Sequence, residues 1–260
     1  MIWKVIGQSV IGSSHIQNGK TCEDALCCQL ITIENENEAL IGFVSDGAGS
    51  AKYAANASQT TVKLAVGIAQ NLIGSGIEIG EEHLLALVEQ VYDALNTMAK
   101  ELNEPINEFS CTLLGFIILP ERACFLQIGD GAIVRADATG YFTHIWWPHN
   151  GEYQNTTTFL IDDPNFPNLR TKIIEESISE VAIFTDGLQM LALNNETETV
   201  HQPFFNNLFK WLRKASDEEH VSILNNKLNE YLAGDIINNR TDDDKTLFLA
   251  TKNKDDAQGI

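Results

Sequence analysis

Short runs of apolar residues, several of them alternating with polar residues, recur along the chain and predict strands. A period of two is typical of a strand with one buried face, and a short continuous apolar run is typical of a strand buried on both faces. The expected strands cover 2–7, 25–33, 39–45, 109–119, 122–129, 132–137, 140–146, 156–161, 171–175, 180–184 and 245–251. Gly129-Asp130-Gly131 and Ala138-Thr139-Gly140 are predicted as tight reversals between strands.

A helical period appears in four other segments. In 81–101, apolar residues from Leu84 to Met98 recur every three or four positions and therefore share one helix face. Residues 51–73 show the same pattern, and 203–213 and 217–232 are predicted as helices before the last strand. Consecutive strands without helical crossovers favour antiparallel sheets, so the order of elements predicts an α+β fold with helices laid over the sheets.

The length of 260 residues allows a substantial core, and no shift in composition marks a linker. We therefore expect one domain over 1–260. Residues 147–170 contain three of the six prolines together with Asn and Gly, and are predicted as a surface excursion that could serve as a lid or flap.

The chain is strongly acidic, with 36 Asp and Glu against 17 Lys and Arg and a formal net charge of −19. Such a surface repels polyphosphate, which argues against binding to nucleic acid or to an anionic membrane. The simpler interpretation is that an acidic surface alone accounts for this excess. The sharper interpretation is that some of the acids bind metal ions.

Five cysteines, an odd number, fall largely inside apolar runs, which favours buried free thiols in a reducing compartment. The first residues lack a long apolar run typical of a secretion signal, and no stretch approaches the ~18 apolar residues that span a bilayer. These features predict a cytoplasmic protein. They do not indicate an oligomeric state.

Aspartates stand where predicted core strands begin or end. Asp46, Asp130 and Asp186 follow apolar runs, and Asp242-Asp243-Asp244 precedes the last one. Carboxylates that converge must be neutralised by protons or cations, and oxygen ligands suit Mg or Mn. The alternative is a structural sandwich in which each Asp-Gly only forms a turn or caps a helix. No phosphate loop, His-Glu-x-x-His or Gly-x-Ser-x-Gly motif offers a competing chemistry.

In order, six segments resemble the motifs of the type 2C metal-dependent serine/threonine protein phosphatases, in a diverged bacterial branch. The match extends from about residue 7 to 251 and rests on the order and spacing of all six. The segments are Cys22-Glu23-Asp24-Ala25, Val44-Ser45-Asp46-Gly47-Ala48-Gly49-Ser50, Ser110-Cys111-Thr112-Leu113, Ile128-Gly129-Asp130-Gly131, Phe184-Thr185-Asp186-Gly187-Leu188 and Asp243-Asp244-Lys245-Thr246.

The resemblance implies a four-layer α/β/β/α sandwich of two antiparallel sheets flanked by helices, with metal ions in a cleft at one edge. It implies two Mg or Mn ions and room for a third, and hydrolysis of phosphoserine and phosphothreonine in proteins by a metal-activated water. A phosphorylated protein is then the substrate, and a cognate Ser/Thr kinase is an expected partner.

The resemblance also implies roles for individual residues. Asp46 would bridge two metals, the carbonyl of Gly47 would bind one, and Asp186 and Asp243 would bind the other. Asp130 would help to hold the third, weaker metal. Together with Asp46, the residues implied to be catalytic are Glu23 and Asp24, which would orient the waters of the metals.

Several positions depart from the family pattern, among them Ser50 in place of a glycine and Asp244 in place of an asparagine. Two departures concern the groups that give a proton and grip the phosphate. Ala48 stands where many members have a histidine that is a candidate general acid, and Gly19 stands where an arginine usually grips the phosphate. Lys20 and His15 lie in the same loop and are the candidate replacements. These departures leave a second hypothesis open, in which the chain is a weakly active or inactive phosphatase-like module that binds metal and a protein partner.

Overall fold

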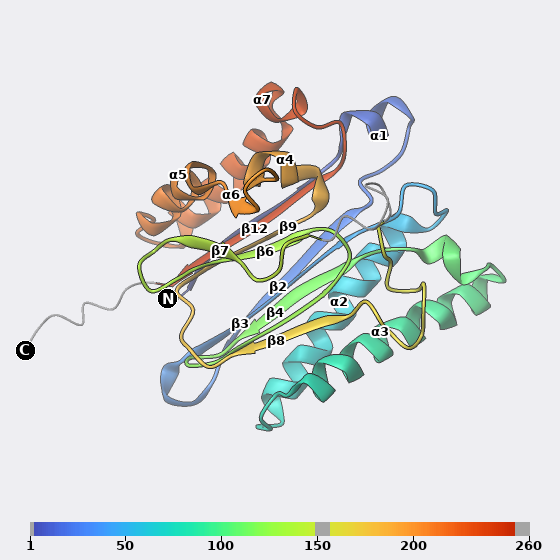
Figure 1. The fold of residues 1–260 in the computed structure, drawn as a ribbon, viewed down its shortest axis with the longest axis horizontal. Helices are drawn as coiled ribbons and strands as arrows, with labels where there is room; N and C mark the ends of the chain where they lie inside the picture. The colour runs from blue at the N-terminus through green and yellow to red at the C-terminus, as the bar shows by residue number, and fades with distance from the viewer. Residues whose placement is uncertain (1–2, 149–156, 253–260) are drawn as a thin grey trace, which may run out of the picture.

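The computed structural model describes residues 3–148 and 157–252, and in it two five-stranded antiparallel sheets pack face to face with helices on both outer sides (Figure 1). One sheet has the order β1-β12-β9-β6-β7 and the other β2-β3-β4-β5-β8. The strands are β1 (Trp3–Val10), β2 (Asp24–Thr32), β3 (Glu38–Asp46), β4 (Leu113–Ile118), β5 (Ala123–Ile128), β6 (Ala132–Ala136), β7 (Phe142–His144), β8 (Arg170–Ile174), β9 (Glu180–Phe184) and β12 (Lys245–Lys252), and β10 (Leu193–Asn194) pairs with β11 (Thr199–Val200) apart from them.

Two pairs of long helices cover the sandwich. α2 (Ala54–Gly74) and α3 (Glu81–Leu102) lie on the β2-β3-β4-β5-β8 sheet, and α5 (Gln202–Arg213) and α6 (Glu218–Ala233) lie on the other sheet (Figure 1). The short elements are α1 (Ser13–Gln17), α4 (Gln189–Ala192), α7 (Asp235–Asn238) and the 3₁₀ turns η1 (Glu34–Glu36), η2 (Ile106–Phe109) and η3 (Asp186–Leu188).

Three apolar layers hold these elements together. The central layer lies between the sheets and includes Val44 and Phe116 from one sheet and Ile183 and Phe248 from the other, all buried. The two outer layers join each sheet to its helices. Strands buried on both faces are mostly apolar at successive positions, which accounts for β4 and for the apolar runs 123–126 of β5 and 181–184 of β9.

The predicted fold class, the long helices and most predicted strands are confirmed. The strand predicted over 156–161 is wrong within its described part, since residues 157–161 form coil and a turn in which the Leu160 amide donates to the Cys111 carbonyl. The apolar residues of that segment instead belong to a loop that packs on the core, where Leu160 and Ile161 are buried.

The Gly129-Asp130-Gly131 reversal does not join paired strands. β5 and β6 belong to different sheets, so this turn carries the chain across the sandwich. Gly129 has a φ of 117°, which favours glycine, and the Gln127 side chain bonds the carbonyls of Gly129 and Gly131. The Ala138-Thr139-Gly140 turn does join paired strands, β6 and β7.

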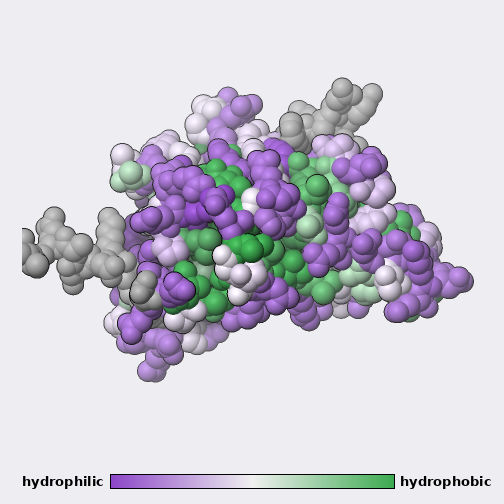
Figure 2. Space-filling model, turned by 90° about the horizontal axis from the view of Figure 1, so that it is seen from below, coloured by the Kyte–Doolittle hydropathy of each residue, from purple (hydrophilic) through white to green (hydrophobic). Residues whose placement is uncertain are grey.

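All five cysteines are free, as expected, but only Cys111 and Cys124 are buried. Cys28 is exposed because β2 is an edge strand whose outer side is only partly covered. Among the described residues, no helix is both long and apolar enough to cross a membrane. Hydrophilic residues dominate the face seen from below and surround hydrophobic residues at its centre (Figure 2).

Candidate metal centre

Three aspartates that are far apart in the sequence meet at one end of the sandwich. Asp46 is the last residue of β3, Asp186 opens η3 just after β9, and Asp130 lies in the turn before β6. One carboxylate oxygen from each lies within 4.8 Å of the other two. The sequence predicted this convergence from the position of each aspartate at a strand end.

Antiparallel registry explains why these ends coincide. Phe184 at the end of β9 is opposite Ala132 at the start of β6 and opposite Leu247 near the start of β12. On the other sheet, Asp24 at the start of β2 is directly opposite Asp46 at the end of β3. The ends of β3 and β9 and the beginnings of β2, β6 and β12 therefore lie at one edge of the sandwich, together with the acids next to them.

The close approach of these carboxylates changes their protonation. Burial, followed by the charges of Asp24, Asp186 and Asp243, raises the pKa of Asp46 well above its ordinary value. Burial and the charges of Asp130 and Asp243 raise the pKa of Asp186 to about 7. Burial also raises the pKa of Asp130. Like charges in a poorly hydrated site favour the protonated form unless a cation neutralises them.

Two buried oxygens of this cluster, Oδ1 of Asp24 and Oδ1 of Asp130, have no hydrogen-bond partner in the described part of the chain. A buried carboxylate oxygen without a donor is costly, and a divalent cation removes that cost. The other carboxylate oxygen of Asp130, Oδ2, accepts a hydrogen bond from the Thr157 hydroxyl at 2.5 Å. The donor set is entirely oxygen, so the residues fit Mg or Mn.

Asp24 is buried and held by two hydroxyl groups. Oδ2 accepts hydrogen bonds from Thr185 at 2.7 Å and Thr246 at 2.8 Å. Burial raises its pKa to about 8 against the opposing effect of these two donors, and the charges of Asp244 and Asp186 add to the rise. The two threonines were not among the predicted site residues, although each stands inside one of the six family-like segments, and that position was the available signal.

Asp243 and Gly47 occupy flanking positions. Asp243 lies beside Gly187, and its charge raises the pKa values of Asp46 and Asp186, but it is not one of the three carboxylates within 4.8 Å. Gly47 donates its amide to the Glu23 carbonyl. The predicted coordination by the Gly47 carbonyl stays a prediction.

Asp244, which stands where the family pattern has an asparagine, connects the last strand to the N-terminal loop. Its Oδ1 accepts the Gly12 amide at 2.6 Å, and its Oδ2 accepts the Glu23 amide at 2.5 Å. Oδ2 also lies 2.9 Å from Nδ1 of His15. Because a carboxylate oxygen accepts hydrogen bonds, Nδ1 of His15 donates to Asp244, and Nε2 is left facing Glu23.

The two predicted basic residues meet at Glu23. Nζ of Lys20 lies 3.2 Å from Oε1 of Glu23 and 2.5 Å from the Gly49 carbonyl, and Nε2 of His15 lies 3.5 Å from Oε2 of Glu23. A Cβ on Gly49 would lie within 4.0 Å of all three side chains. His15, Lys20 and Glu23 thus form a mixed-charge wall beside the loop that follows Asp46.

The structure gives a reason for one departure from the family pattern. Gly19 has a φ of 66° just after α1, a conformation that an arginine would adopt only with strain. Its amide donates to the Ile16 carbonyl, which ends the helix. Lys20 follows immediately and turns its side chain toward Glu23.

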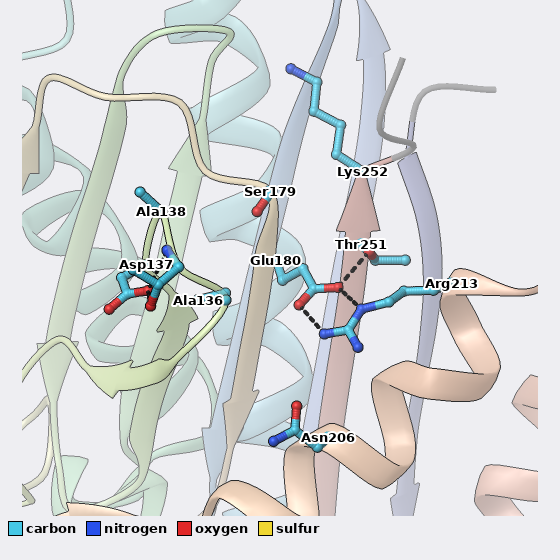
Figure 3. A pocket seen from close by; sticks show the side chains of 11 residues that line it. Ala136, Asp137, Ala138, Ser179, Glu180, Asn206, Arg213, Thr251 and Lys252 are labelled. Atoms are coloured by element: carbon cyan, nitrogen blue, oxygen red, sulfur yellow. Dashed lines mark hydrogen bonds and ion pairs between the residues drawn. The ribbon is translucent and has the colours of Figure 1, made fainter. Parts of the chain in front are cut away.

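A cavity of about 690 Å³ lies at the ends of β6, β9 and β12 that are opposite to the metal centre (Figure 3). Its buried carboxylate, Glu180, accepts two hydrogen bonds of 2.6 Å from Arg213 and one of 2.9 Å from Thr251. The Glu180 carboxylate is paired with Arg213, whereas no cationic side chain among the described residues forms an ion pair with Asp46, Asp130 or Asp186. The unpaired acidic cluster is therefore the better candidate for chemistry.

Comparison with known proteins agrees with this geometry. The family model described as protein phosphatase 2C matches residues 11–233. The chain is 34% identical over 252 residues to serine/threonine-protein phosphatase 3 of Escherichia coli (strain K12), covering 96% of this chain and 98% of that protein.

Solved structures resemble the chain in fold at low sequence identity. Serine/threonine phosphatase Stp1 from Staphylococcus aureus aligns with a TM-score of 0.60 at 16% identity, covering 96% of this chain and 95% of that one. The catalytic domain of serine threonine protein phosphatase PstP, in complex with 2 manganese ions, aligns with a TM-score of 0.58 at 16% identity, covering 97% and 99%.

Proposed function

Because the chain belongs to the protein phosphatase 2C family, we propose that it hydrolyses phosphoserine and phosphothreonine in proteins, with the aspartate cluster as its metal centre. The observation that carries this proposal is the approach of Asp46, Asp130 and Asp186 within 4.8 Å, with raised pKa values and an unpartnered buried oxygen on Asp130. A cluster so arranged is suited to cations.

Asp46, Asp130, Asp186 and Asp243, with the carbonyl of Gly47, would hold Mg or Mn, as two ions with a third at Asp130. Bound divalent ions lower the pKa of water near neutral pH and screen the charge of a phosphate. Their positive field also offsets the repulsion that a chain of net charge −19 exerts on phosphate.

The side chains around the cluster have supporting roles. Glu23 and Asp24 orient water, and Asp24 is fixed for this by Thr185 and Thr246. His15 and Lys20 replace the missing histidine and arginine of the family. Both reach the Asp46 loop near Gly49, from where they can contact the phosphate. In its imidazolium form, His15 would also carry a proton on Nε2 that it could give to the departing alcohol while Nδ1 stays bonded to Asp244.

The substrate is a phosphorylated protein, and a cognate Ser/Thr kinase and a cytoplasmic location fit the same activity. We also keep the single domain over 1–260 and the flap over 147–170 as proposals. Residues 149–156 of that flap lie outside the described residues. Thr157, next to them, bonds Asp130 and so links the segment to the metal centre.

The second hypothesis, a metal-binding module without turnover, is not favoured. The relative with 34% identity is named a serine/threonine-protein phosphatase, and the alignment covers 98% of its length. In addition, His15 and Lys20 supply basic groups at the site despite Ala48 and Gly19.

The test is hydrolysis of p-nitrophenyl phosphate and of a phosphothreonine peptide by the full chain at saturating Mn, with Asp46→Asn as the inactive variant. We expect Mn-dependent turnover of both substrates by the unaltered chain and its loss in the variant. Bound Mn without any turnover would instead establish the module hypothesis.

A further inference from the structure

A groove of about 560 Å³ runs between α5 and α6 on the outside of the β1-β12-β9-β6-β7 sheet. We call it the helical groove. Its α6 wall carries side chains every three or four residues along one face, and its α5 wall has the same spacing. The walls include Ile223, Lys227 and Tyr231 from α6, and Phe204, Asn207 and Trp211 from α5.

Large apolar side chains of the helical groove remain open to solvent. Trp211 is 58% exposed, Ile223 46% and Tyr231 36%, while Phe204 and Leu228 beneath them are buried. The packing of α5 and α6 on the sheet is therefore complete without these three side chains. Contiguous exposed apolar surface of this kind marks interaction sites.

The groove continues into a neighbouring cavity of about 630 Å³, since Phe204, Asn207 and Tyr231 line both. There the most exposed large apolar residues are Met190 at 72% and Ile236 at 74%. Met190 lies in α4, just after Asp186, and the surface is thus a long strip that ends on an element attached to the metal centre.

The charge of the helical groove is opposite to that of the whole chain, whereas the neighbouring cavity is lined by one cation, Arg240, and one anion, Glu196. The charged residues that line the helical groove are Lys227 and the titratable His220, and Nζ of Lys210 and of Lys214 lie 5.8 and 5.9 Å from the ring centre of Trp211. Within the described residues, these three lysines form no ion pair with a carboxylate. A protein with a net charge of −19 therefore presents free cations here.

We propose that the helical groove docks an acidic amphipathic helix of a partner protein. Apolar residues of that helix, spaced three and four apart, would fill the space around Trp211, Ile223 and Tyr231, as in other helix-in-groove complexes. Its carboxylates would pair with Lys210, Lys214 and Lys227. A second copy is disfavoured as occupant, because a two-fold pairing would bring the lysines of one groove against those of the other. This docking is independent of whether the metal centre turns over phosphate.

The test uses the full chain as bait for a phage-displayed library of peptides of ~18 residues, about five helical turns. Selected peptides are then measured by fluorescence anisotropy against the unaltered chain, Trp211→Ala, and the control Leu102→Ala, a similarly exposed residue (50%) at the end of α3. We expect acidic sequences with helical apolar spacing. Their dissociation constants should rise about tenfold or more in Trp211→Ala and stay unchanged in Leu102→Ala.

Several outcomes would overturn the proposal. They are selected peptides that are basic or lack helical spacing, equal binding to Trp211→Ala, Trp211-dependent binding to phosphatidylserine vesicles, and Trp211-dependent self-association in sedimentation. Hydrolysis of p-nitrophenyl phosphate is measured on the same samples and should be equal in Trp211→Ala and the unaltered chain. A chain that binds peptides but hydrolyses nothing would refute only the proposed function.

Discussion

Nδ1 of His15 lies 2.9 Å from a carboxylate oxygen of Asp244, which joins a helix near the start of the chain to the beginning of its last strand. The same carboxylate accepts the amides of Gly12 and Glu23. Asp244 therefore positions the whole loop that presents His15, Lys20 and Glu23 to the metal centre.

Asp244→Asn should disrupt that loop, because an asparagine has one acceptor oxygen and must turn its NH₂ toward at least one N–H. A buried donor without an acceptor costs about 1–3 kcal/mol. We expect a fall in kcat for p-nitrophenyl phosphate of about tenfold or more, and a shift of the His15 tautomer equilibrium visible in ¹⁵N NMR spectra.

The control for this variant is Asp137→Asn. Asp137 also accepts backbone amides, from Thr139 and Tyr141, but all through Oδ1, an oxygen that asparagine retains. Unchanged kcat and an unchanged His15 spectrum in Asp244→Asn would show that the loop does not depend on this carboxylate.

Asp46→Asn should have opposite effects on metal binding and on the metal-free fold. Loss of a ligand should weaken Mn binding, measured by calorimetry, by more than ~100-fold, since even partners that only orient a ligand are worth about 10–100-fold. At neutral pH the variant should also raise the Tm of the metal-free chain by about 2–4 °C, because asparagine removes the cost of burying a carboxyl group whose pKa is raised in the folded state. Asp137→Asn should change neither, and an Asp46→Asn variant with full Mn affinity would support the turn-forming alternative.

The metal-free chain should lose stability as pH rises from about 4 to about 8. In the folded state the pKa values of Asp24 and Asp186 are raised to about 8 and about 7, so both keep protons that the unfolded chain releases near its usual pKa of ~3.9. Because the folded state binds more protons in this window, the free energy of unfolding falls with pH.

Thermal melts in EDTA across that range provide the measurement. Tm should decline toward pH 8, and added Mn should restore it by binding the ionised carboxylates. A Tm in EDTA that is constant or rises between pH 5 and pH 8 would contradict the raised pKa values.

Two threonines of β12 separate site effects from stability effects. Thr246 donates to Asp24 at the metal centre, and Thr251 donates to Glu180 at the far end of the strand, and both are buried. Thr246→Val and Thr251→Val should each cost about 1–2 kcal/mol in urea unfolding. Only Thr246→Val should also weaken Mn binding, by about 10–100-fold. Equal Mn affinity in the two variants would exclude a role of Thr246 in the site.

The placement of the long helices and of most strands was predictable because periodicity is a local property. The helix face from Leu84 to Met98 and the apolar run of β9 need no knowledge of partners. The strand predicted over 156–161 failed within its described part because Leu160 and Ile161 are buried by a loop, and a loop that covers a core has apolar residues too.

The sequence by itself determined that acids stand at strand ends and that their surroundings match a phosphatase family. The tertiary structure decided which acids converge, since sheet registry places Asp130 with Asp46 and Asp186. The tertiary structure also brings Asp244 into contact with the loop that contains His15, and it leaves the helical groove open to solvent. The physical reason is that the repeat of apolar residues depends only on neighbours in the sequence. The partner of a charged group instead depends on contacts between segments that are far apart in the sequence, such as those of Asp244 and Gly12.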